Sequence, residues 1–422
     1  MRAMAKKFLH FPEGFLWGAA TSAHQVEGGL HNNWTVWERQ NAERLASGSQ
    51  KAYDTPSVHW RAIKDQAQDP ANYISDVACD HYNRYEEDFD LAASLGHNAH
   101  RLSIEWSRIE PRRGQFDSDE IEHYRRVIRA LKKRGMEPFV TLFHWTTPVW
   151  VSEQNDWHSN RTANDFLTYV RYVVDNLGSE VKFWTTFNEP EVFCQMSYWQ
   201  AYWPPEGKSF VRAVLVGKRL IRTHNRAYKI IKSANPDAQV GAVINNVYVE
   251  AGQNWVSKKV ANIAMFFIND FFISGIRFHQ DFIGVNYYFH MVTKGLKAEF
   301  STIDPTDMGW GMYPEGIYHV LKKLRMFKKP IYITECGIAD RQDIYRSWYI
   351  AEILRQTHRA VADGVDVRGF MYWALIDNFE WDKGFWPRFG LIEIDYVNGR
   401  RRKVRSSAKA YAKIIRANGL EA

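Results

Sequence analysis

A short apolar run, a polar or aromatic turn and a stretch with helical spacing follow one another repeatedly along the chain. The apolar runs are rich in β-branched and aromatic residues: "FLWGAAT" from Phe15, "NAHRLSIEW" from Asn98, "EPFVTLFHW" from Glu137, "VKFWTTFNE" from Val181, "QVGAVINN" from Gln239, "DFIGVNYY" from Asp281, "PIYITECG" from Pro330 and "GFMYWALID" from Gly369. Runs of this length and composition are typical of strands that are buried on both faces. We therefore predict eight parallel strands.

Stretches with helical periodicity separate most of these runs. Residues 120–135 read "EIEHYRRVIRALKKRG", with apolar residues at intervals of three and four from Ile121 to Leu131, and Gly135 in the position of a C-terminal cap. Apolar strands that alternate with amphipathic helices indicate a parallel sheet covered on both faces. Eight such units predict an α/β fold, a single closed (β/α)8 TIM barrel whose elaborated βα loops form the mouth of a site.

Two features of the chain bear on its domain organisation. Residues 1–422 contain no internal repeat, no low-complexity tract and no linker rich in Pro, Gly or Ser, so we expect a single barrel domain over the whole range. The alternative α/β architecture is an open, doubly wound sheet that binds a dinucleotide. It would need a Gly-rich turn after the first strand, and "EGG" at 27–29 lacks the required spacing.

The predicted strand ends carry polar and aromatic side chains. They are Gln25, Glu105, Trp106, His144, Trp145, Asn188, Glu189, Asn245, Asn286, Tyr288, Glu335, Trp373, Asp377, Glu380 and Trp381. In a barrel the loops leaving the carboxyl ends of the strands converge on one mouth, where the chemistry takes place. Indole rings stack on the apolar face of a sugar, while amides, imidazoles and carboxylates bind its hydroxyl groups. This set of residues therefore favours a carbohydrate ligand.

Two of the strand ends finish in a glutamate, and each has an ordinary structural interpretation. Glu189 in "TTFNEP" is typical of a solvated loop residue after a strand. Glu335 in "YITECG" is within reach of a structural ion pair with Arg101 on the second strand. The same pairing, however, is what keeps a nucleophilic carboxylate ionised at neutral pH. The residues alone leave both interpretations open.

Composition and cysteine usage bear on location. The N-terminus "MRAMAKKFLHFPEGFLW" contains neither a long apolar segment nor a small-residue cleavage site, so we expect no membrane anchor and a cytoplasmic protein. Cys79, Cys194 and Cys336 are widely spaced and odd in number, which favours a reducing compartment without disulfides or a metal cluster. The chain has 17 Trp, 21 Tyr and 25 Phe, more aromatic surface than packing needs, so some of these rings are expected to line a site.

The net charge is +7, and the most basic run is "GRRRKVR" at 399–405. Such a run could bind nucleic acid, but no nucleic-acid-binding module accompanies it. We interpret it as a solvated turn before the last helix and expect no nucleic-acid partner.

Seven motifs in order give the chain a family resemblance. They are "GFLWGAATSAHQVEGG", "DVACDHYNRYEEDFDLAASLGHNAHRLSIEWSRIEP", "TLFHWTTPVWV", "TFNEP", "GVNYY", "YITECGIAD" and "YWALIDNFEWDKGFWPRFGL". With these motifs the chain resembles glycoside hydrolase family 1, enzymes of the β-glucosidase and β-galactosidase type, over essentially its whole length. The resemblance implies hydrolysis of small β-glycosides or oligosaccharides without a cofactor or metal ion.

The resemblance also implies roles for individual residues. Glu189 matches the family's acid/base and Glu335 its nucleophile, while Arg101 and Tyr288 match the partners that hold the nucleophile. Asn188 matches a contact to the sugar 2-hydroxyl. The remaining sugar contacts are implied at Gln25, His144, Trp145, Glu380 and Trp381 for the 3-, 4- and 6-hydroxyls, at Trp373 for the ring face, and less specifically at Asn245 and Asn286. Two glutamates in these roles imply a two-step mechanism that retains the anomeric configuration.

Two alternatives within the same barrel stay open. One branch of the family cleaves 6-phospho-β-glycosides, but it replaces the glutamate at position 380, whose negative charge would repel a phosphate. A non-catalytic carbohydrate-binding homologue would generally lack one of the two carboxylates, and both are present. The sequence leaves the choice among glucose, galactose and fucose and the oligomeric state undetermined.

The sequence departs from the family pattern at two places. Cys336 follows the nucleophile where the family usually has Asn, and it either changes the hydrogen bonds behind Glu335 or fills space; we favour packing. The segment after "HNNWTVWE" is long and polar up to about Asp76, so we expect an unusual aglycone entrance.

Overall fold

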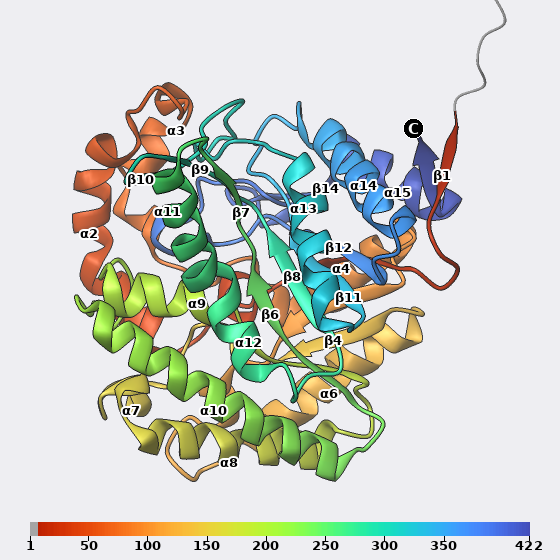
Figure 1. Ribbon diagram of the computed structural model, residues 1–422. Coiled ribbons are helices and arrows are strands. Elements are labelled where there is room, and N and C mark those ends of the chain that lie inside the picture. The colour runs from red at the N-terminus through yellow and green to blue at the C-terminus, as the bar shows by residue number, and fades with distance from the viewer. Residues whose placement is uncertain (1–6) are drawn as a thin grey trace, which may run out of the picture.

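The computed structural model describes residues 7–422, and its centre is a closed barrel of eight parallel strands (Figure 1). The strands follow the order β11-β12-β2-β3-β4-β5-β6-β8 around the barrel. Their bounds are β2 Leu16–Ala20, β3 Ala99–Ser103, β4 Glu137–Thr141, β5 Phe183–Asn188, β6 Gln239–Asn245, β8 Ile283–Tyr287, β11 Ile331–Cys336 and β12 Val367–Trp373. The predicted TIM barrel is confirmed, and the open doubly wound sheet is excluded because β12 pairs with β2.

Helices surround the barrel on the outside (Figure 1). The longer ones are α4 His81–Ser94, α6 Ser118–Lys133, α8 Asn160–Leu177, α10 Phe210–Ala234, α13 Glu315–Leu324, α14 Arg346–Ala362 and α15 Ser406–Ala417. The helix predicted over residues 120–135 is α6: the Asp117 carboxylate accepts hydrogen bonds from the backbone amides at its start. Gly135 follows its last turn with φ +72°, a conformation that glycine adopts without strain.

Aromatic side chains fill the lower half of the barrel. Phe139 and Phe183 stack with their ring centroids 4.2 Å apart, and Tyr332 packs edge-on against both. All three point inward from the first half of their strands and are buried. Because this end is packed solid, a ligand can enter only at the carboxyl-terminal end of the strands.

The long polar segment expected to modify the entrance is helical. It forms α2 Asn33–Tyr53, α3 Trp60–Ala67 and the 3-10 turn η1 Pro70–Tyr73. Asn32 and Thr35 cap α2 reciprocally, each side chain bonding the other's backbone amide. Trp34 on α2 packs on Trp381 with ring centroids 4.7 Å apart. The segment therefore supports one wall of the mouth.

A second elaboration lies above β6 and β8 (Figure 1). The strands β7 Tyr248–Ala251, β9 His290–Lys294 and β10 Lys297–Phe300 form a separate sheet in the order β10-β9-β7. The helical segment beside it comprises α11 Trp255–Met265, the π-helical turn η4 Phe266–Asp270 and α12 Phe271–Ile276.

This helical segment, residues 255–276, is unusually apolar for the outside of a barrel. Its mean hydropathy over 18 residues is 1.3, which together with its length would allow it to cross a membrane, and 28% of that stretch is buried. Ala261 packs inward against Val249 and Met291 of the small sheet. Trp255 and Ile263 are 69% and 60% exposed. The sequence analysis did not anticipate this exposed apolar face.

The interpretation of "GRRRKVR" as a solvated turn is only partly correct, because Gly399 and Arg400 lie in a turn but the following residues do not. Residues 401–404 form β14, which pairs with β13 Ile392–Asp395 in a hairpin. The Arg402 Nε lies 2.8 Å from an oxygen of buried Asp88, and Arg405 donates two 2.9 Å hydrogen bonds to the carboxylate of Asp377. Because single buried carboxylates need a cationic partner, two of the arginines in this run are structural.

The described ends of the chain meet on the side of the barrel opposite the mouth. The strand β1 Phe8–His10 pairs antiparallel with β15 Gly419–Glu421. Asn418, just before β15, accepts a 2.9 Å hydrogen bond from the indole of Trp17 at the start of β2. The ribbon therefore packs beside α14, next to the amino-terminal end of β2.

Candidate active site

Glu335 and Glu189 reach the mouth from different strands. Glu335 is the fifth residue of β11, and Glu189 directly follows β5. Glu189 has φ +41°, an uncommon conformation for a residue with a side chain, and Pro190 then begins the short helix α9 Pro190–Cys194. Both glutamates are only 4% exposed. The backbone is therefore strained at Glu189, and this turn places the carboxyl group of Glu189 at the mouth.

Glu335 has a cation and a phenol as partners. Arg101 on β3 forms an ion pair with its Oε1, and the Tyr288 hydroxyl donates a 2.8 Å hydrogen bond to its Oε2. Arg101 is itself held by hydrogen bonds to the side chains of Asn188, at 2.7 Å, and Thr141, at 3.1 Å. These contacts fix the carboxylate of Glu335 in one orientation and neutralise its charge.

Glu189 has a neutral partner instead. The Asn286 side-chain amide donates a 2.6 Å hydrogen bond to its Oε1, and Thr334 in turn donates a 2.9 Å hydrogen bond to the Asn286 carbonyl oxygen. Within residues 7–422 Glu189 forms no ion pair. The two glutamates are thus chemically similar but lie in electrostatically different surroundings.

This difference decides which glutamate holds a proton. Burial raises the pKa of Glu189 well above its ordinary value, and the negative charge of Glu335 raises it further. Burial also raises the pKa of Glu335, but Arg101 and the Tyr288 hydroxyl oppose that rise. When the pair holds one proton, the proton therefore resides on Glu189 and Glu335 is the anion.

Gln25 and Glu380 form a second polar group at the mouth. Gln25 lies on the short helix α1 Ala23–Val26, and its amide donates a 3.2 Å hydrogen bond to Oε2 of Glu380. The Asn378 amide donates another at 3.0 Å to the same oxygen. Burial raises the pKa of Glu380 to about 8. Its second oxygen is left for a ligand.

His144 and Trp145 follow β4 and contact Asn188. The Nε2 of His144 is 3.2 Å from the Asn188 amide, and the Trp145 indole N–H donates a 2.9 Å hydrogen bond to the Asn188 backbone carbonyl. The family resemblance implies that Trp145 binds a sugar hydroxyl. In this structure its one side-chain N–H is committed to the backbone, so Trp145 offers ring surface rather than a donor.

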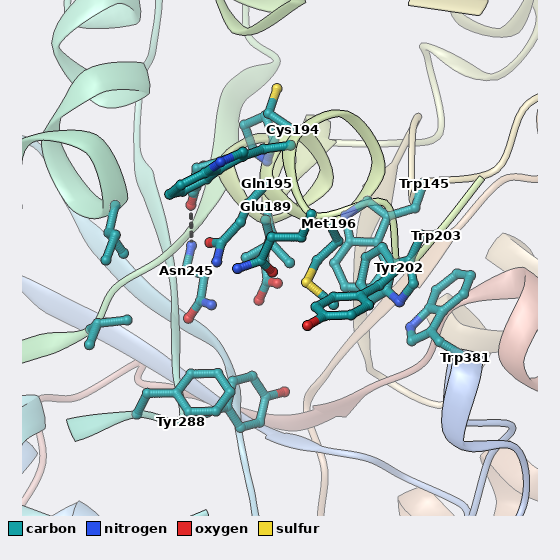
Figure 2. Close-up of a pocket in the computed structure, with 18 of the residues that line it drawn as sticks. Trp145, Glu189, Cys194, Gln195, Met196, Tyr202, Trp203, Asn245, Tyr288 and Trp381 are labelled. Carbon is teal, nitrogen blue, oxygen red and sulfur yellow. Dashed lines mark hydrogen bonds between the residues drawn. The ribbon is translucent and has the colours of Figure 1, made fainter. Parts of the chain in front are cut away.

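The other indoles form one aromatic wall. Trp373 ends β12 and lies parallel to His144, while Trp381, in the 3-10 turn η6 Trp381–Lys383, packs on Trp145 at 4.8 Å between ring centroids. Figure 2 shows Trp145, Trp203 and Trp381 on one side of the pocket and Tyr288 across from them. Apolar ring faces thus stand opposite the polar groups, as a pyranose requires.

Asn245 ends β6 and faces the same space as Glu189 (Figure 2). Its backbone N–H donates a 2.6 Å hydrogen bond to Glu191, and its buried Oδ1 has no partner among residues 7–422. A buried oxygen without a partner is costly unless a ligand or water satisfies it. Asn245 is therefore available to a substrate.

One cavity of about 420 Å³ collects most of the predicted residues. It is lined by Gln25, His144, Trp145, Glu189, Asn245, Tyr288, Glu335, Trp373, Glu380 and Trp381. Arg101 and Asn286 contact the glutamates from behind this lining, and Asn188 contacts Arg101 and Asn286 in turn. Two other polar strand ends do not reach it: Glu105 bonds Ser107 and Thr146, and Asp377 is paired with Arg405.

Sequence reasoning missed several residues of the cavity. Glu191 is half-buried two positions after Glu189, and burial of its carboxyl group raises its pKa to about 8. The motif "NEPE" itself could have drawn attention to it. Tyr202, Trp203 and Trp310 also line the cavity, and only the surplus of aromatic residues had indicated that such a wall exists.

Cys336, next to the nucleophile position, points away from the site. It is fully buried, with its sulfur 3.6 Å from the Tyr349 hydroxyl on α14. Successive residues of a strand face opposite sides, so Glu335 faces the barrel interior and Cys336 the helices. The interpretation of Cys336 as packing agrees with this position. Among residues 7–422 no cluster of three His, Cys, Asp or Glu side chains could hold a metal ion.

A closed parallel barrel whose mouth combines a protonated glutamate, an ionised glutamate, amides and indoles is the architecture of a glycoside hydrolase. The sequence profile of glycosyl hydrolase family 1 matches residues 8–277 and 274–420. The chain belongs to glycosyl hydrolase family 1 and is a glycosidase.

The relatives cover the whole chain. The β-glucosidase A of Thermotoga maritima is 32% identical over 97% of this chain and 99% of its own length, and the β-galactosidase of Pyrococcus woesei is 30% identical over 97% and 98%. Among solved structures, the β-glycosidase from Pyrococcus horikoshii has a TM-score of 0.85 at 35% identity over 99% of this chain and 97% of its own. The Thermotoga maritima β-glucosidase in complex with glucoimidazole has a TM-score of 0.85 at 31% identity, over 97% and 100%.

Proposed function

We propose that the protein is a retaining β-glycosidase that removes a terminal β-D-glucosyl, β-D-galactosyl or β-D-fucosyl residue from small glycosides. The observation that carries the proposal is the asymmetry of the two glutamates: Arg101 and Tyr288 hold Glu335 as an anion, while Glu189 keeps its proton. A nucleophile and an acid are the two groups that such a reaction needs.

In the first step Glu335 attacks the anomeric carbon while the bond to the leaving oxygen breaks. Glu189 gives its proton to that oxygen, so the aglycone leaves as a neutral alcohol and the sugar becomes esterified to Glu335. Glu335 is now uncharged, and the pKa of Glu189 falls. The Glu189 carboxylate then takes a proton from water, whose oxygen displaces Glu335 from the anomeric carbon. Two displacements restore the original configuration.

The sugar is expected to bind between Glu335, the Gln25 and Glu380 pair and the indole of Trp373. A sugar-like ligand is supported by a related enzyme, the Thermotoga maritima β-glucosidase, whose structure was solved in complex with glucoimidazole. A free 6-hydroxyl is favoured over a 6-phosphate because the second oxygen of Glu380 can accept a hydrogen bond from a hydroxyl group, whereas an ionised phosphate has no such proton to donate. A purely carbohydrate-binding role is disfavoured because both glutamates are present and buried in contact with partners.

We also propose that residues 1–422 form one domain and that the protein is cytoplasmic. The second point rests on the three cysteines, all of which are free and buried thiols. Cell fractionation of the native source tests it.

The test of the proposed function is a panel of 4-nitrophenyl β-glycosides with gluco, galacto, fuco and manno sugars, together with 4-nitrophenyl β-glucoside 6-phosphate. We expect kcat/KM to be largest for one of the first three. Proton NMR during early turnover is expected to show the β-anomer of the free sugar before mutarotation. An α-anomer as first product, or activity on the 6-phosphate alone, would contradict the proposal.

A further inference from the structure

The helical segment 255–276 carries apolar side chains that face solvent. Trp255, Ile263 and Phe266 are exposed, and they recur along the segment at intervals of eight and three residues. This spacing places the three side chains on one side of a helix. The opposite side faces the fold, because Ala261 packs inward against the small sheet. The segment therefore has a buried inner side and an apolar outer side.

The first turns of α10 extend this apolar surface. Phe210 at the start of α10 and Phe267 of η4 have ring centroids 5.2 Å apart, so the two helical segments meet there (Figure 1). Val211 and Leu215, on the outer side of α10, are 66% and 53% exposed. A contiguous exposed apolar patch on a soluble domain marks an interaction surface.

The same two elements are strongly basic. Neither α10 nor the segment 255–276 contains a carboxylate apart from Asp270, which pairs with Lys323 at 2.6 Å. Their exposed cations are Lys218, Arg222, Arg226 and Lys229 on α10 and Lys258 and Lys259 on α11. Within residues 7–422 none of these six cations forms an ion pair. A surface with this charge favours a partner that carries negative charge.

Exposed aromatic rings next to cations stand at both ends of the apolar segment. The Lys259 ammonium lies 5.0 Å from the ring centroid of Trp255. The Arg277 guanidinium lies 4.5 Å from the ring centroid of Phe278, which is 78% exposed. Tryptophan and long cationic side chains are favoured where the apolar interior of a bilayer meets its polar head groups. These two pairs therefore favour contact with a lipid surface.

The inner side of the segment is held in the fold. The buried Asn269 side chain donates a 2.8 Å hydrogen bond to the Val247 carbonyl and accepts a 2.9 Å hydrogen bond from the Val247 amide. Phe272 and Ile273 of α12 are buried in the main core. Only the outer side is thus available to a membrane. An amphipathic segment of this kind lies in the plane of the interface, with its apolar side at the boundary of head groups and acyl chains.

We define the docking face as the six exposed cations together with Val211, Leu215, Trp255, Ile263 and Phe266. We propose that the docking face binds the surface of a lipid bilayer that contains anionic lipids. The apolar side chains enter the boundary between head groups and acyl chains, while the cations contact the anionic head groups. Phe210 and Phe267 also line the active-site cavity, so the bound protein holds its mouth beside the lipid surface.

This binding is peripheral and needs no membrane anchor. It is compatible with the proposed cytoplasmic location, because the cytoplasmic leaflet of a membrane carries anionic lipids. The proposal concerns an interaction surface and does not depend on the proposed function.

Two other partners fit the docking face less well. A second copy of this chain in a twofold dimer would place the docking face against itself, so the cations of one copy would face those of the other. A nucleic acid would use the cations, but its affinity comes mainly from its phosphates and leaves the aliphatic side chains of Val211, Leu215 and Ile263 without a role. An anionic bilayer matches both the charge and the apolar surface.

The experiment is co-sedimentation of the full chain with vesicles. One set consists of phosphatidylcholine alone, and the other contains phosphatidylcholine and phosphatidylglycerol in a ratio of about 7 to 3. We expect the partition coefficient to be at least about tenfold larger for the anionic vesicles and to fall as NaCl is raised from about 0.1 to 0.5 M. Equal binding to the two sets, or no binding to either, would overturn the proposal.

Two pairs of lysines test the electrostatic part. The double variant Lys258→Glu/Lys259→Glu is expected to lower the partition coefficient on anionic vesicles by about thirtyfold. The control is Lys409→Glu/Lys413→Glu, the same change of charge at exposed positions of α15, with a loss of less than about threefold. Equal losses for the two double variants would show that binding follows net charge and not the docking face.

The apolar part is tested by Trp255→Ser/Phe266→Ser, which is expected to lower the partition coefficient by about tenfold or more. Val397→Ser, at a side chain that is 91% exposed in the turn after β13, is the control and is expected to change it by less than about twofold. Circular dichroism during thermal unfolding checks that all variants fold. Unchanged vesicle binding by Trp255→Ser/Phe266→Ser would overturn the proposal.

The other two partners are tested in parallel. Sedimentation equilibrium of the wild type without vesicles reports self-association, and fluorescence anisotropy reports binding of a labelled single-stranded oligonucleotide. We expect neither to respond to Trp255→Ser/Phe266→Ser. A dimer that this variant dissociates, or tighter binding to the oligonucleotide than to anionic vesicles, would assign the docking face to a different partner and overturn the proposal.

Discussion

The Asn286 side-chain amide donates a 2.6 Å hydrogen bond to Oε1 of Glu189, the carboxyl group that is expected to work as acid and then as base. A hydrogen bond of this kind stabilises the carboxylate and so lowers the pKa of Glu189, against burial and the charge of Glu335, which raise it. Asn286 thereby sets how readily the proton of Glu189 is released.

Asn286→Ala is expected to move the pH profile of kcat/KM. The acidic limb reports ionisation of Glu335 and the basic limb loss of the proton from Glu189. Because Asn286 lowers the pKa of both groups, its removal shifts both limbs to higher pH. The profile of an aryl glycoside between pH 4 and 9 checks this. Asn83→Ala, on the exposed side of α4, is the control and is expected to leave both limbs in place. A shift to lower pH would contradict the assignment.

Glu335→Gly is expected to lower hydrolysis by about a thousandfold or more, because no glycosyl-enzyme can form. Azide then fits the space of the lost side chain and attacks from the same face, which gives an α-glycosyl azide. NMR of the azide product checks the anomer. Circular dichroism controls for folding, since the variant leaves Arg101 buried without its partner. Unchanged hydrolysis would remove Glu335 as the nucleophile.

Glu189→Ala is expected to affect poor leaving groups far more than good ones. A dinitrophenolate needs no proton, so it still esterifies Glu335, whereas an alkyl glycoside is cleaved extremely slowly. Azide, freed from repulsion by Glu189, is expected to accelerate the second step and give a β-glycosyl azide, the opposite anomer from the Glu335 variant. Equal slowing of both substrate types, without azide rescue, would show that Glu189 is not the acid/base.

Glu380→Ala is expected to cost about 2 to 4 kcal/mol in kcat/KM on the preferred aryl glycoside, partly in kcat. The reason is that Glu380 shares one oxygen with Gln25 and Asn378 and has the other free for a sugar hydroxyl. Glu393→Ala, in the β13–β14 hairpin, serves as the control. An unchanged kcat/KM would place Glu380 outside the sugar site.

Arg405→Met is expected to destabilise the fold by about 3 kcal/mol at pH 7, because it leaves the buried carboxylate of Asp377 with only the more distant Arg388. Burial alone would raise the pKa of Asp377, but Arg405 and Arg388 hold it below the ordinary 3.8. The stabilisation from this pair is therefore present above about pH 4 and is lost as the pH falls through the lowered pKa. Urea unfolding checks the change.

The matched control is Lys403→Met in the same strand. The Lys403 side chain is 77% exposed and pairs with Glu393 at 3.6 Å, so its removal is expected to change the free energy of unfolding by less than about 1 kcal/mol. If Arg405→Met and Lys403→Met lowered the free energy of unfolding by similar amounts, the basic run would not be divided into buried and solvated positions.

The barrel and the identity of its strand-end residues could be predicted from sequence because both depend on local patterns. A strand buried on both faces must be apolar, and the residues at its carboxyl end reach the mouth. Glu335 lies in the last two residues of β11, and Glu189 directly follows β5. The alternation along β11 likewise sends Cys336 away from Glu335. The pattern could not predict which groups form hydrogen bonds with one another. The indole N–H of Trp145 donates to the backbone carbonyl of Asn188 because two loops meet in space.

Other features escaped because they arise from long-range contacts. Arg402 and Arg405 appear in the sequence as a solvated basic run, and they are buried only because the hairpin β13–β14 folds onto Asp88 and Asp377, which lie far away in the sequence. The additional aromatic residues of the cavity were missed for a related reason. The π-helical turns Gln195–Trp199 and Phe266–Asp270 have no recognised sequence signal, and the rings of Phe210 and Phe267 lie 5.2 Å apart because helical segments distant in the sequence pack together.

The pairing of β1 with β15 has a practical consequence for handling the enzyme. Because that two-stranded ribbon lies next to the amino-terminal end of β2, a flexible tether added after Ala422 leaves from a surface away from the catalytic mouth. A resin or electrode coupled through such a tether would hold each molecule with its opening toward the bulk solution. Immobilised enzyme oriented in this way is expected to retain the specific activity of the free enzyme toward small glycosides.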